Sequence, residues 1–249
     1  MAIEKERLSP DAAVPRWVWL EHLARYDFGA RFAAGKVVLD CACGAGIGSE
    51  TFARAGAASV AAFDVSREEV DRARARTALP NLTFQHGSAL ALPVASHSID
   101  VYISFETIEH IDEDRAFLRE AQRVLKTDGV FVCSTPNRAV TNPGASLAHR
   151  PWNRFHVREY SRDEFVALLR EFFPRVELYG QNPKPAWLAQ SVEGLGRILP
   201  MHGAVRLNQV MKLPQLVVDS QARHAVRALE PGCAYEYLVA VCRGSGAAP

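Results

Sequence analysis

The stretch that decides the fold is Val38-Leu-Asp-Cys-Ala-Cys-Gly-Ala-Gly-Ile-Gly48, in which a short apolar segment runs into an acid and a glycine-rich turn. The segment 36–40 has the length and apolar character of a buried strand. Glycines let backbone amides approach a ligand closely, and the helix predicted over 48–55 begins at this turn. The stretch therefore predicts a strand, a ligand-binding turn and a helix in immediate succession.

The order of strand, acid and helix is repeated along the chain. The segment 59–64 is a second apolar strand that ends in Asp64, and Ser66-Arg-Glu-Glu69 has the pattern of a capping box that begins a helix. Further strands are predicted at 81–85, 99–105, 130–133, 176–179 and 235–242. Strands that alternate with helices form a parallel sheet with helices on both faces, and its ligands lie at the carboxyl ends of the strands.

The predicted elements divide the chain into a lead-in, a core and an insertion. A core is predicted over 36–180 and 234–243, after an N-terminal helical lead-in over 1–35. Within this lead-in, helical spacing predicts an apolar face made of Trp17, Leu20, Leu23 and Ala24. Residues 181–233 are predicted to be a helical insertion, which either covers the site or joins two copies of the chain as a homodimer. Residues 137–160 are rich in Asn, Pro, Arg and aromatic residues, and we expect them to cover a substrate.

The composition excludes several classes of partner. The formal net charge is +1, from 29 basic and 28 acidic side chains, which gives no basic surface for nucleic acid. No apolar run approaches the roughly 20 residues of a membrane span, and the N-terminus lacks the apolar segment of a signal peptide. The five cysteines are scattered in apolar settings, which argues against a disulfide framework. We therefore expect a cytoplasmic protein that acts on a small molecule.

The acids beside the glycine turn limit the kind of cofactor. An ionised acid at the tip of the second strand, Asp64, can accept hydrogen bonds from both hydroxyls of a ribose. A dinucleotide site would need a third glycine at Ser49 and would place a pyrophosphate over the turn. Asp40 is poorly placed for a pyrophosphate but suits the ammonium group of an amino acid. The residues therefore disfavour an NAD-dependent dehydrogenase.

Several segments together resemble a known family. They are VVLDCACGAGIGSETFA, AAFDVS, the loop 87–93, SFETIEHI and RVLKTDGVFVCSTPN. In this order and spacing they resemble the motifs of class I S-adenosylmethionine (SAM)-dependent methyltransferases of the small-molecule and ubiquinone-biosynthesis type, over about residues 20–180. The resemblance implies an α/β fold with a Rossmann-like sheet of seven strands, mostly parallel, in which the last strand is antiparallel.

The resemblance also implies which residues bind SAM, according to the part of SAM that each one meets. The methionine end is lined by Asp40, Cys41, Gly44 and Gly46. The ribose binds to Asp64, and the adenine is bordered by Val65, Ser88 and Ala89. The site is closed by Phe105, Glu106 and, from the lead-in helix, Tyr26.

Two positions depart from the family pattern. The family usually has glycine where this chain has Ala42, and a methyl group fits there if φ stays negative. The family often has aspartate where this chain has Ser88, whose hydroxyl can still bind the adenine amine, although less strongly. We expect neither departure to prevent SAM binding.

Methyl transfer to a hydroxyl requires alignment and a base. His110 follows the tip of the fourth strand, where the methyl group is expected, and is the first candidate for the base. The second is His156, in the expected substrate-covering segment. Glu106, Glu109 and His110 also resemble a cluster that holds a divalent metal in some quinone O-methyltransferases, but we expect no metal here.

The sequence thus predicts a SAM-dependent O-methyltransferase that acts on a small polar acceptor, such as a sugar or a secondary metabolite. An N-methyltransferase that acts on a small amine is the first alternative, because methylation of a neutral amine needs positioning more than a base. A SAM-binding subunit without turnover is the second. The product of either methyl transfer would be S-adenosylhomocysteine.

Overall fold

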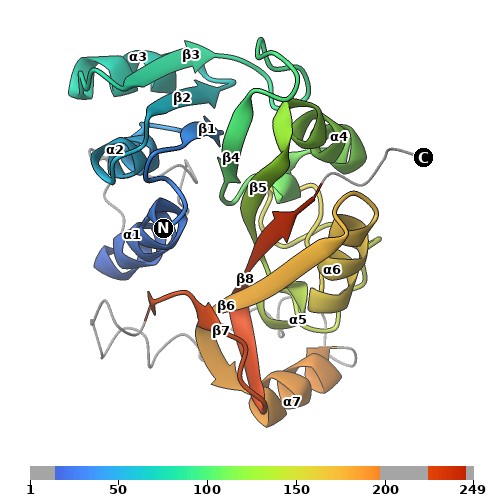
Figure 1. Ribbon diagram of the computed structural model, residues 1–249. Coiled ribbons are helices and arrows are strands. Elements are labelled where there is room, and N and C mark those ends of the chain that lie inside the picture. Colours follow the sequence, from blue (N-terminus) through green and yellow to red (C-terminus); the bar gives the residue numbers. More distant parts are fainter. Residues whose placement is uncertain (1–14, 197–223, 245–249) are drawn as a thin grey trace.

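A single eight-stranded sheet, with the strand order β3-β2-β1-β4-β5-β8-β6-β7, organises the computed structural model, which describes residues 15–196 and 224–244 (Figure 1). The strands are β1 (Val37–Cys41), β2 (Ser59–Asp64), β3 (Leu82–His86), β4 (Ile99–Ser104), β5 (Leu125–Pro136), β6 (Arg175–Pro185), β7 (Arg227–Ala228) and β8 (Cys233–Arg243). The helices are α1 (Arg16–Ala30), α2 (Ile47–Arg54), α3 (Arg67–Arg76), the 3-10 turn η1 (Ile108–His110), α4 (Asp114–Val124), α5 (Arg138–Thr141), α6 (Arg162–Arg170) and α7 (Ala186–Gly196).

The predicted fold class is confirmed. Strands β3, β2, β1, β4 and β5 are parallel neighbours, whereas β8 lies antiparallel between β5 and β6. The sheet has one strand more than the sequence predicted, because the two-residue β7 pairs with the edge of β6. Every predicted strand is present, and β5 and β6 are longer than predicted.

Helices cover both faces of the sheet, with α1 and α2 on one side and α4 and α6 on the other (Figure 1). Val38 and Ile103 pack against the first pair of helices, while Tyr102 and Phe131 pack against the second. Each fully buried side chain of this size contributes about 1.5–3 kcal/mol to folding. Because β1, β2, β4 and β5 are parallel, their carboxyl ends meet at one edge of the sheet, which is where the site forms.

The buried face of α1 differs from the predicted apolar face. Its buried residues are Glu21, Ala24, Arg25, Phe28 and Gly29, so two ionisable side chains lie inside the protein. Of the predicted face, Trp17, Leu20 and Leu23 are only half-buried. The face is offset because Glu21 and Arg25 meet polar partners on β6.

The predicted insertion over 181–233 contains the end of β6, the helix α7 and the short strand β7 among its described residues. Residues 197–223, like residues 1–14 of the lead-in, lie outside the described residues. The role of this interval as a cover or as a homodimer contact therefore stays a prediction. No helix within residues 15–196 and 224–244 has the length and apolar character needed to cross a bilayer.

Ala42 adopts a conformation that the sequence analysis did not expect. Its φ is +62°, in the left-handed region, and its side chain is exposed. A residue with a Cβ atom in this region is strained by roughly 1–2 kcal/mol. The family's glycine at this position therefore has a physical reason, and the present chain carries the strain.

Replacement of Ala42 by Gly should stabilise the protein. Relief of the strain outweighs the roughly 0.4–1 kcal/mol by which glycine favours the unfolded chain, so we expect a net gain of about 0.5–1 kcal/mol in a urea unfolding titration. Ala58→Gly is the matched control, because Ala58 is also exposed but is not among the residues with positive φ. The control should be destabilised, and an equal response of the two variants would contradict the assigned strain.

Candidate active site

The Asp64 carboxylate connects the tips of β1 and β2. Its Oδ2 atom accepts the Gly44 amide at 2.8 Å, and its Oδ1 atom accepts the Ser66 amide at 2.8 Å. The capping box predicted at Ser66 is therefore only half formed: the Ser66 hydroxyl accepts the Glu69 amide at 3.4 Å, but Asp64 takes the amide expected to bind Glu69. A carboxylate has about four lone-pair positions, which leaves acceptor capacity for a ribose.

Two glycines give the turn between β1 and α2 its shape. Gly44 and Gly46 have φ values of +51° and +77°. A Cβ atom at Gly46 would lie 2.4 Å from the ring of Phe84, so only glycine fits there. Gly44 donates its amide to Asp64, and Gly46 donates its amide to the Cys43 carbonyl at 2.9 Å, so both amides hold the turn in shape. Binding of a ligand at this turn stays a prediction.

Asp40 is a buried acid next to this turn, only 7% exposed. Its Oδ2 atom accepts the Ser49 hydroxyl at 2.5 Å. Burial, reinforced by the charge of Asp64, raises the pKa of Asp40 to about 7, and the Ser49 hydrogen bond opposes this rise. The hydroxyl of Ser49 therefore favours the ionised form of Asp40. In the sequence analysis, Ser49 was used only as an argument against a dinucleotide site.

The predicted adenine contacts and Cys41 differ in their exposure. Val65 is 63% exposed after the tip of β2, where a flat apolar ligand can cover it. Ser88 is exposed and its hydroxyl accepts the Leu90 amide at 3.2 Å, while Ala89 packs partly against the core. Cys41 points into the core and is 2% exposed, so only its backbone lies at the turn.

Tyr26, Phe105 and Glu106 lie together beside the tip of β4. The ring centroids of Tyr26 and Phe105 are 6.3 Å apart, and the Tyr26 ring also approaches the α2 backbone at Gly48. Burial and the nearby Asp40 raise the pKa of Tyr26, so its hydroxyl stays protonated. Glu106 has a left-handed backbone, with φ +52°, and its carboxylate accepts the Ser134 hydroxyl at 2.6 Å.

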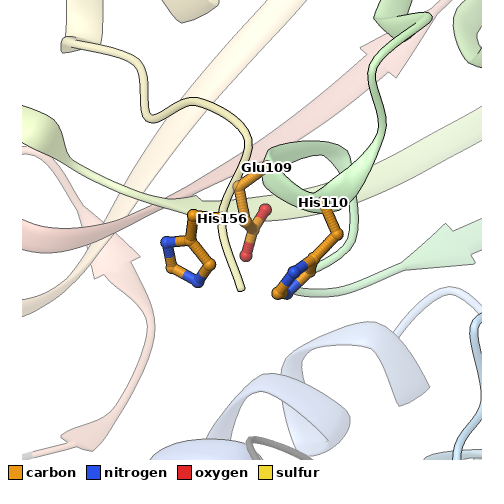
Figure 2. A group of neighbouring side chains, drawn as sticks. All are labelled: Glu109, His110 and His156. Carbon is orange, nitrogen blue, oxygen red and sulfur yellow. The ribbon is translucent and has the colours of Figure 1, made fainter. Parts of the chain in front are cut away.

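Both predicted base candidates meet at one place, although they are 46 positions apart in the sequence. The ring centroids of His110 and His156 are 4.8 Å apart, edge to face, and the side chain of Glu109 lies close to both rings (Figure 2). His110 is accessible to solvent, whereas His156 is 6% exposed. Burial and the charge of Glu106 raise the pKa of Glu109 well above its usual range.

The group able to hold a metal ion differs from the one that the resemblance indicated. Potential ligand atoms of Glu109, His110 and His156 all lie within 4.8 Å of one another, and Glu106 is not part of this group. The Glu109 Oε2 atom accepts the Thr135 hydroxyl at 3.0 Å, and its Oε1 atom has no hydrogen-bond partner. One carboxylate and two imidazoles are a donor set that suits transition ions better than Mg²⁺.

Sequence reasoning missed a buried cation beside the site, and it missed the burial of an acid there. Arg25 is 1% exposed, donates to Gln181 and stacks over the ring of Tyr237, and the nearby Glu106 helps to raise its pKa against the opposing effect of burial. Glu159, which is 2% exposed, accepts a hydrogen bond from His156 Nδ1 at 2.6 Å. The opposite charges of Glu21 and Arg25, four positions apart on one helix face, were the signal available for Arg25.

The Ser49 hydrogen bond leads to a test of the Asp40 pKa. Ser49→Ala removes the donor that favours the ionised carboxylate, so the pKa of Asp40 should rise above about 7. Carboxyl ¹³C NMR of labelled aspartate would measure this titration. Ser98→Ala is the control, since its hydroxyl binds only the Ala95 carbonyl at the surface.

The same shift sets a pH dependence of stability. The pKa of Asp40 is higher in the folded protein than in the unfolded chain. The contribution of protonated Asp40 to the free energy of unfolding is therefore fully present below about pH 4 and is lost as the pH rises through about 7. A pKa of Asp40 that stays unchanged in Ser49→Ala would contradict the assigned role of the hydrogen bond.

Comparisons of sequence identify the domain around this site. Residues 39–133 match the family model described as a methyltransferase domain. A probable SAM-dependent methyltransferase of Mycolicibacterium smegmatis is 36% identical over 164 residues, which are 66% of this chain and 62% of that protein. A ubiquinone biosynthesis O-methyltransferase of Ruegeria sp. is 34% identical over 148 residues, 55% of this chain and 60% of that protein. The chain thus spans about three fifths of the length of these relatives.

Solved structures share the fold over most of the chain. A SAM-dependent methyltransferase of Thermotoga maritima, described as a possible histamine N-methyltransferase, has a TM-score of 0.58 at 16% identity, covering 92% of this chain and 94% of that one. A chain from a complex of a methyltransferase with the Haloferax volcanii Trm112 methyltransferase activator has a TM-score of 0.61 at 18% identity, covering 93% and 94%. The matched domain over residues 39–133, the curated relatives and this fold together support similarity to the class I SAM-dependent methyltransferases, a family whose methyl donor is SAM.

Proposed function

We propose that the chain transfers the methyl group of SAM to a hydroxyl of a small polar acceptor, such as a sugar or a secondary metabolite. The observation that carries this proposal is the pair of imidazoles, His110 and His156, beside the tip of β4 and next to the predicted cofactor residues. A base is useful for a hydroxyl acceptor, because the proton must leave as the new bond forms.

The cofactor residues have complementary tasks in this proposal. Asp64 accepts the ribose hydroxyls while it holds the turn closed through Gly44. Asp40 accepts the ammonium group, and the arriving positive charge favours its ionised form, which Ser49 already supports. Tyr26 and Phe105 form the apolar wall that keeps water from the reacting centre.

The chemical step is an in-line displacement. Bound SAM would supply an electrophilic methyl group on its sulfonium, and attack of the acceptor oxygen on the methyl carbon would release S-adenosylhomocysteine. The O–C bond forms as the S–C bond breaks, and the acceptor proton passes to His110. The imidazole of His110 is accessible and can therefore meet the acceptor. His156 is buried and packs against His110 on the side away from solvent.

N-methylation of a small amine is the second candidate. Glu106 and Glu109 lie near each other at the tip of β4, and the pKa of Glu109 is raised by burial and by this neighbour. A protonated amine would be attracted to this pair of acids and would pass its proton to one of them before its lone pair attacks the methyl group, which favours an amine. A SAM-binding subunit without turnover is the third candidate, and a broad acceptor screen that yields no methylated product would favour it.

Binding of S-adenosylhomocysteine tests the cofactor assignment. Calorimetric titration should show binding to the wild type, and Asp64→Asn should weaken it at least about tenfold, since charge-assisted hydrogen bonds contribute about 1.5–3 kcal/mol each. Asp71→Asn is the control, because Asp71 is an exposed acid on the neighbouring helix α3. Tighter binding of NAD than of S-adenosylhomocysteine would contradict the proposal.

Turnover tests the base. Once an acceptor is found, His110→Ala should lower kcat by about 10²-fold or more, because a general base contributes roughly 10²–10⁴-fold. Tandem mass spectrometry of the product locates the methyl group on oxygen or nitrogen. Unchanged kcat in His110→Ala, with an O-methylated product, would remove His110 from the mechanism.

A further inference from the structure

Hydrogen bonds, joined through the backbone of Phe155, form a chain from the buried Glu159 to His110. His156 Nδ1 lies 2.6 Å from Glu159 Oε1, and Asn153 Nδ2 lies 2.9 Å from His156 Nε2. Asn153 Oδ1 accepts the Phe155 amide at 3.1 Å, and the Phe155 carbonyl oxygen lies 2.9 Å from His110 Nδ1. The chain therefore runs through the loop that carries His156 and ends on the candidate base.

Two groups in this chain can only accept, the Glu159 carboxylate and the Phe155 carbonyl, and they fix the direction of its hydrogen bonds. Glu159 takes hydrogen bonds from Thr141, Asn142 and His156, so it acts as an ionised carboxylate and His156 carries a proton on Nδ1. When His156 is neutral, it presents a lone pair at Nε2, which needs a donor. This requirement orients the Asn153 amide, with its Nδ2 toward His156.

The same reasoning determines the protonation of His110. With Asn153 Nδ2 toward His156, its Oδ1 atom faces the Phe155 amide, which donates to it. The Phe155 carbonyl is an acceptor, so the neutral imidazole of His110 carries its proton on Nδ1. Nε2 is then the basic nitrogen of His110.

The loop is clamped on two sides, so the position of the Phe155 carbonyl is well defined. On one side, the 2% exposed Glu159 is held by Asn142 at 2.6 Å and by Thr141, at the end of α5. On the other side, the Val157 amide donates to the Glu109 carbonyl of η1 at 2.8 Å.

We propose that Asn153 and Glu159 are positioning residues that hold the Phe155 carbonyl on His110 and so select the His110 tautomer with a basic Nε2. The proposal rests on the proposed function in one respect, the role of His110 as the base. A general base acts only if its lone pair, and not its N–H, faces the acceptor. Neither Asn153 nor Glu159 needs to touch the acceptor or the cofactor for this role.

The test is the protonation of the histidine rings, observed by two-dimensional ¹H–¹⁵N NMR of the full chain without cofactor or acceptor. At a pH at which both rings are neutral, His110 and His156 should both be Nδ1–H tautomers. Asn153→Leu should leave His156 in this form but turn His110 into a mixture of tautomers, because the loop loses its internal hydrogen bonds. Ser146→Ala should change neither ring, since Ser146 binds only His149 in the same segment.

Substitution of Asn153 by Asp gives a signature that loss of structure alone cannot produce. A carboxylate facing Nε2 can be satisfied only by a second proton, so His156 lies between two acids and its pKa should rise by roughly one to three pH units. Glu159→Gln keeps an acceptor for His156 Nδ1 and should preserve the tautomers, whereas Glu159→Leu should not. The two variants of Asn153 and the two of Glu159 together distinguish a positioning role of these side chains from a general loss of stability.

Three results would overturn the proposal: an Nε2–H tautomer of His110 in the wild type, an unchanged His110 in Asn153→Leu, or an unchanged His156 pKa in Asn153→Asp. Titration with Co²⁺ alone provides a further check, because a metal bound to His156 Nε2 would displace Asn153 and would also overturn it. If the tautomers are as stated but His110→Ala turns over normally, the proposed base is wrong and the tautomer assignment still holds.

Discussion

The hydrogen bonds that Asp64 accepts from Gly44 and Ser66 are the constraint on which the site depends. They tie the turn after β1 to the start of α3, so the tips of two parallel strands move as one unit. A buried carboxylate that accepts two backbone amides is held more rigidly than an exposed one. Because the same carboxylate is the predicted ribose ligand, the site is shaped before any ligand arrives, which lowers the entropy lost on binding.

The sequence predicted the fold well because the sheet follows local rules. Every strand of more than two residues begins or ends close to where apolar periodicity places it, since each is bounded by a turn or an acid. Features set by distant contacts could not be read in this way. The buried face of α1 contains Glu21 and Arg25 because Asn182 and Gln181, more than 150 positions away, supply their partners.

The residues of the candidate site also fall into those that local rules predict and those that depend on distant contacts. Asp40, Asp64 and the glycines were predictable, because acids at the tips of neighbouring parallel strands must lie close together. The network of Asn153 and Glu159 was not, because it depends on a loop that folds back onto η1 through backbone contacts such as that of Val157. The left-handed backbone of Ala42 could not be predicted either. Residues with a Cβ atom prefer a negative φ, and the sequence analysis expected a negative φ at this position for that reason.

The place of β8 in the sheet has a consequence for the order in which the protein can assemble. β8 follows β6 in the chain but lies between β5 and β6, and its pairs with β5 join residues about 100 positions apart. During synthesis, β6 can dock onto the rest of the sheet only after β8 has left the ribosome. Until then β5 presents an unpaired edge, which is an opportunity for chaperones and a risk of aggregation.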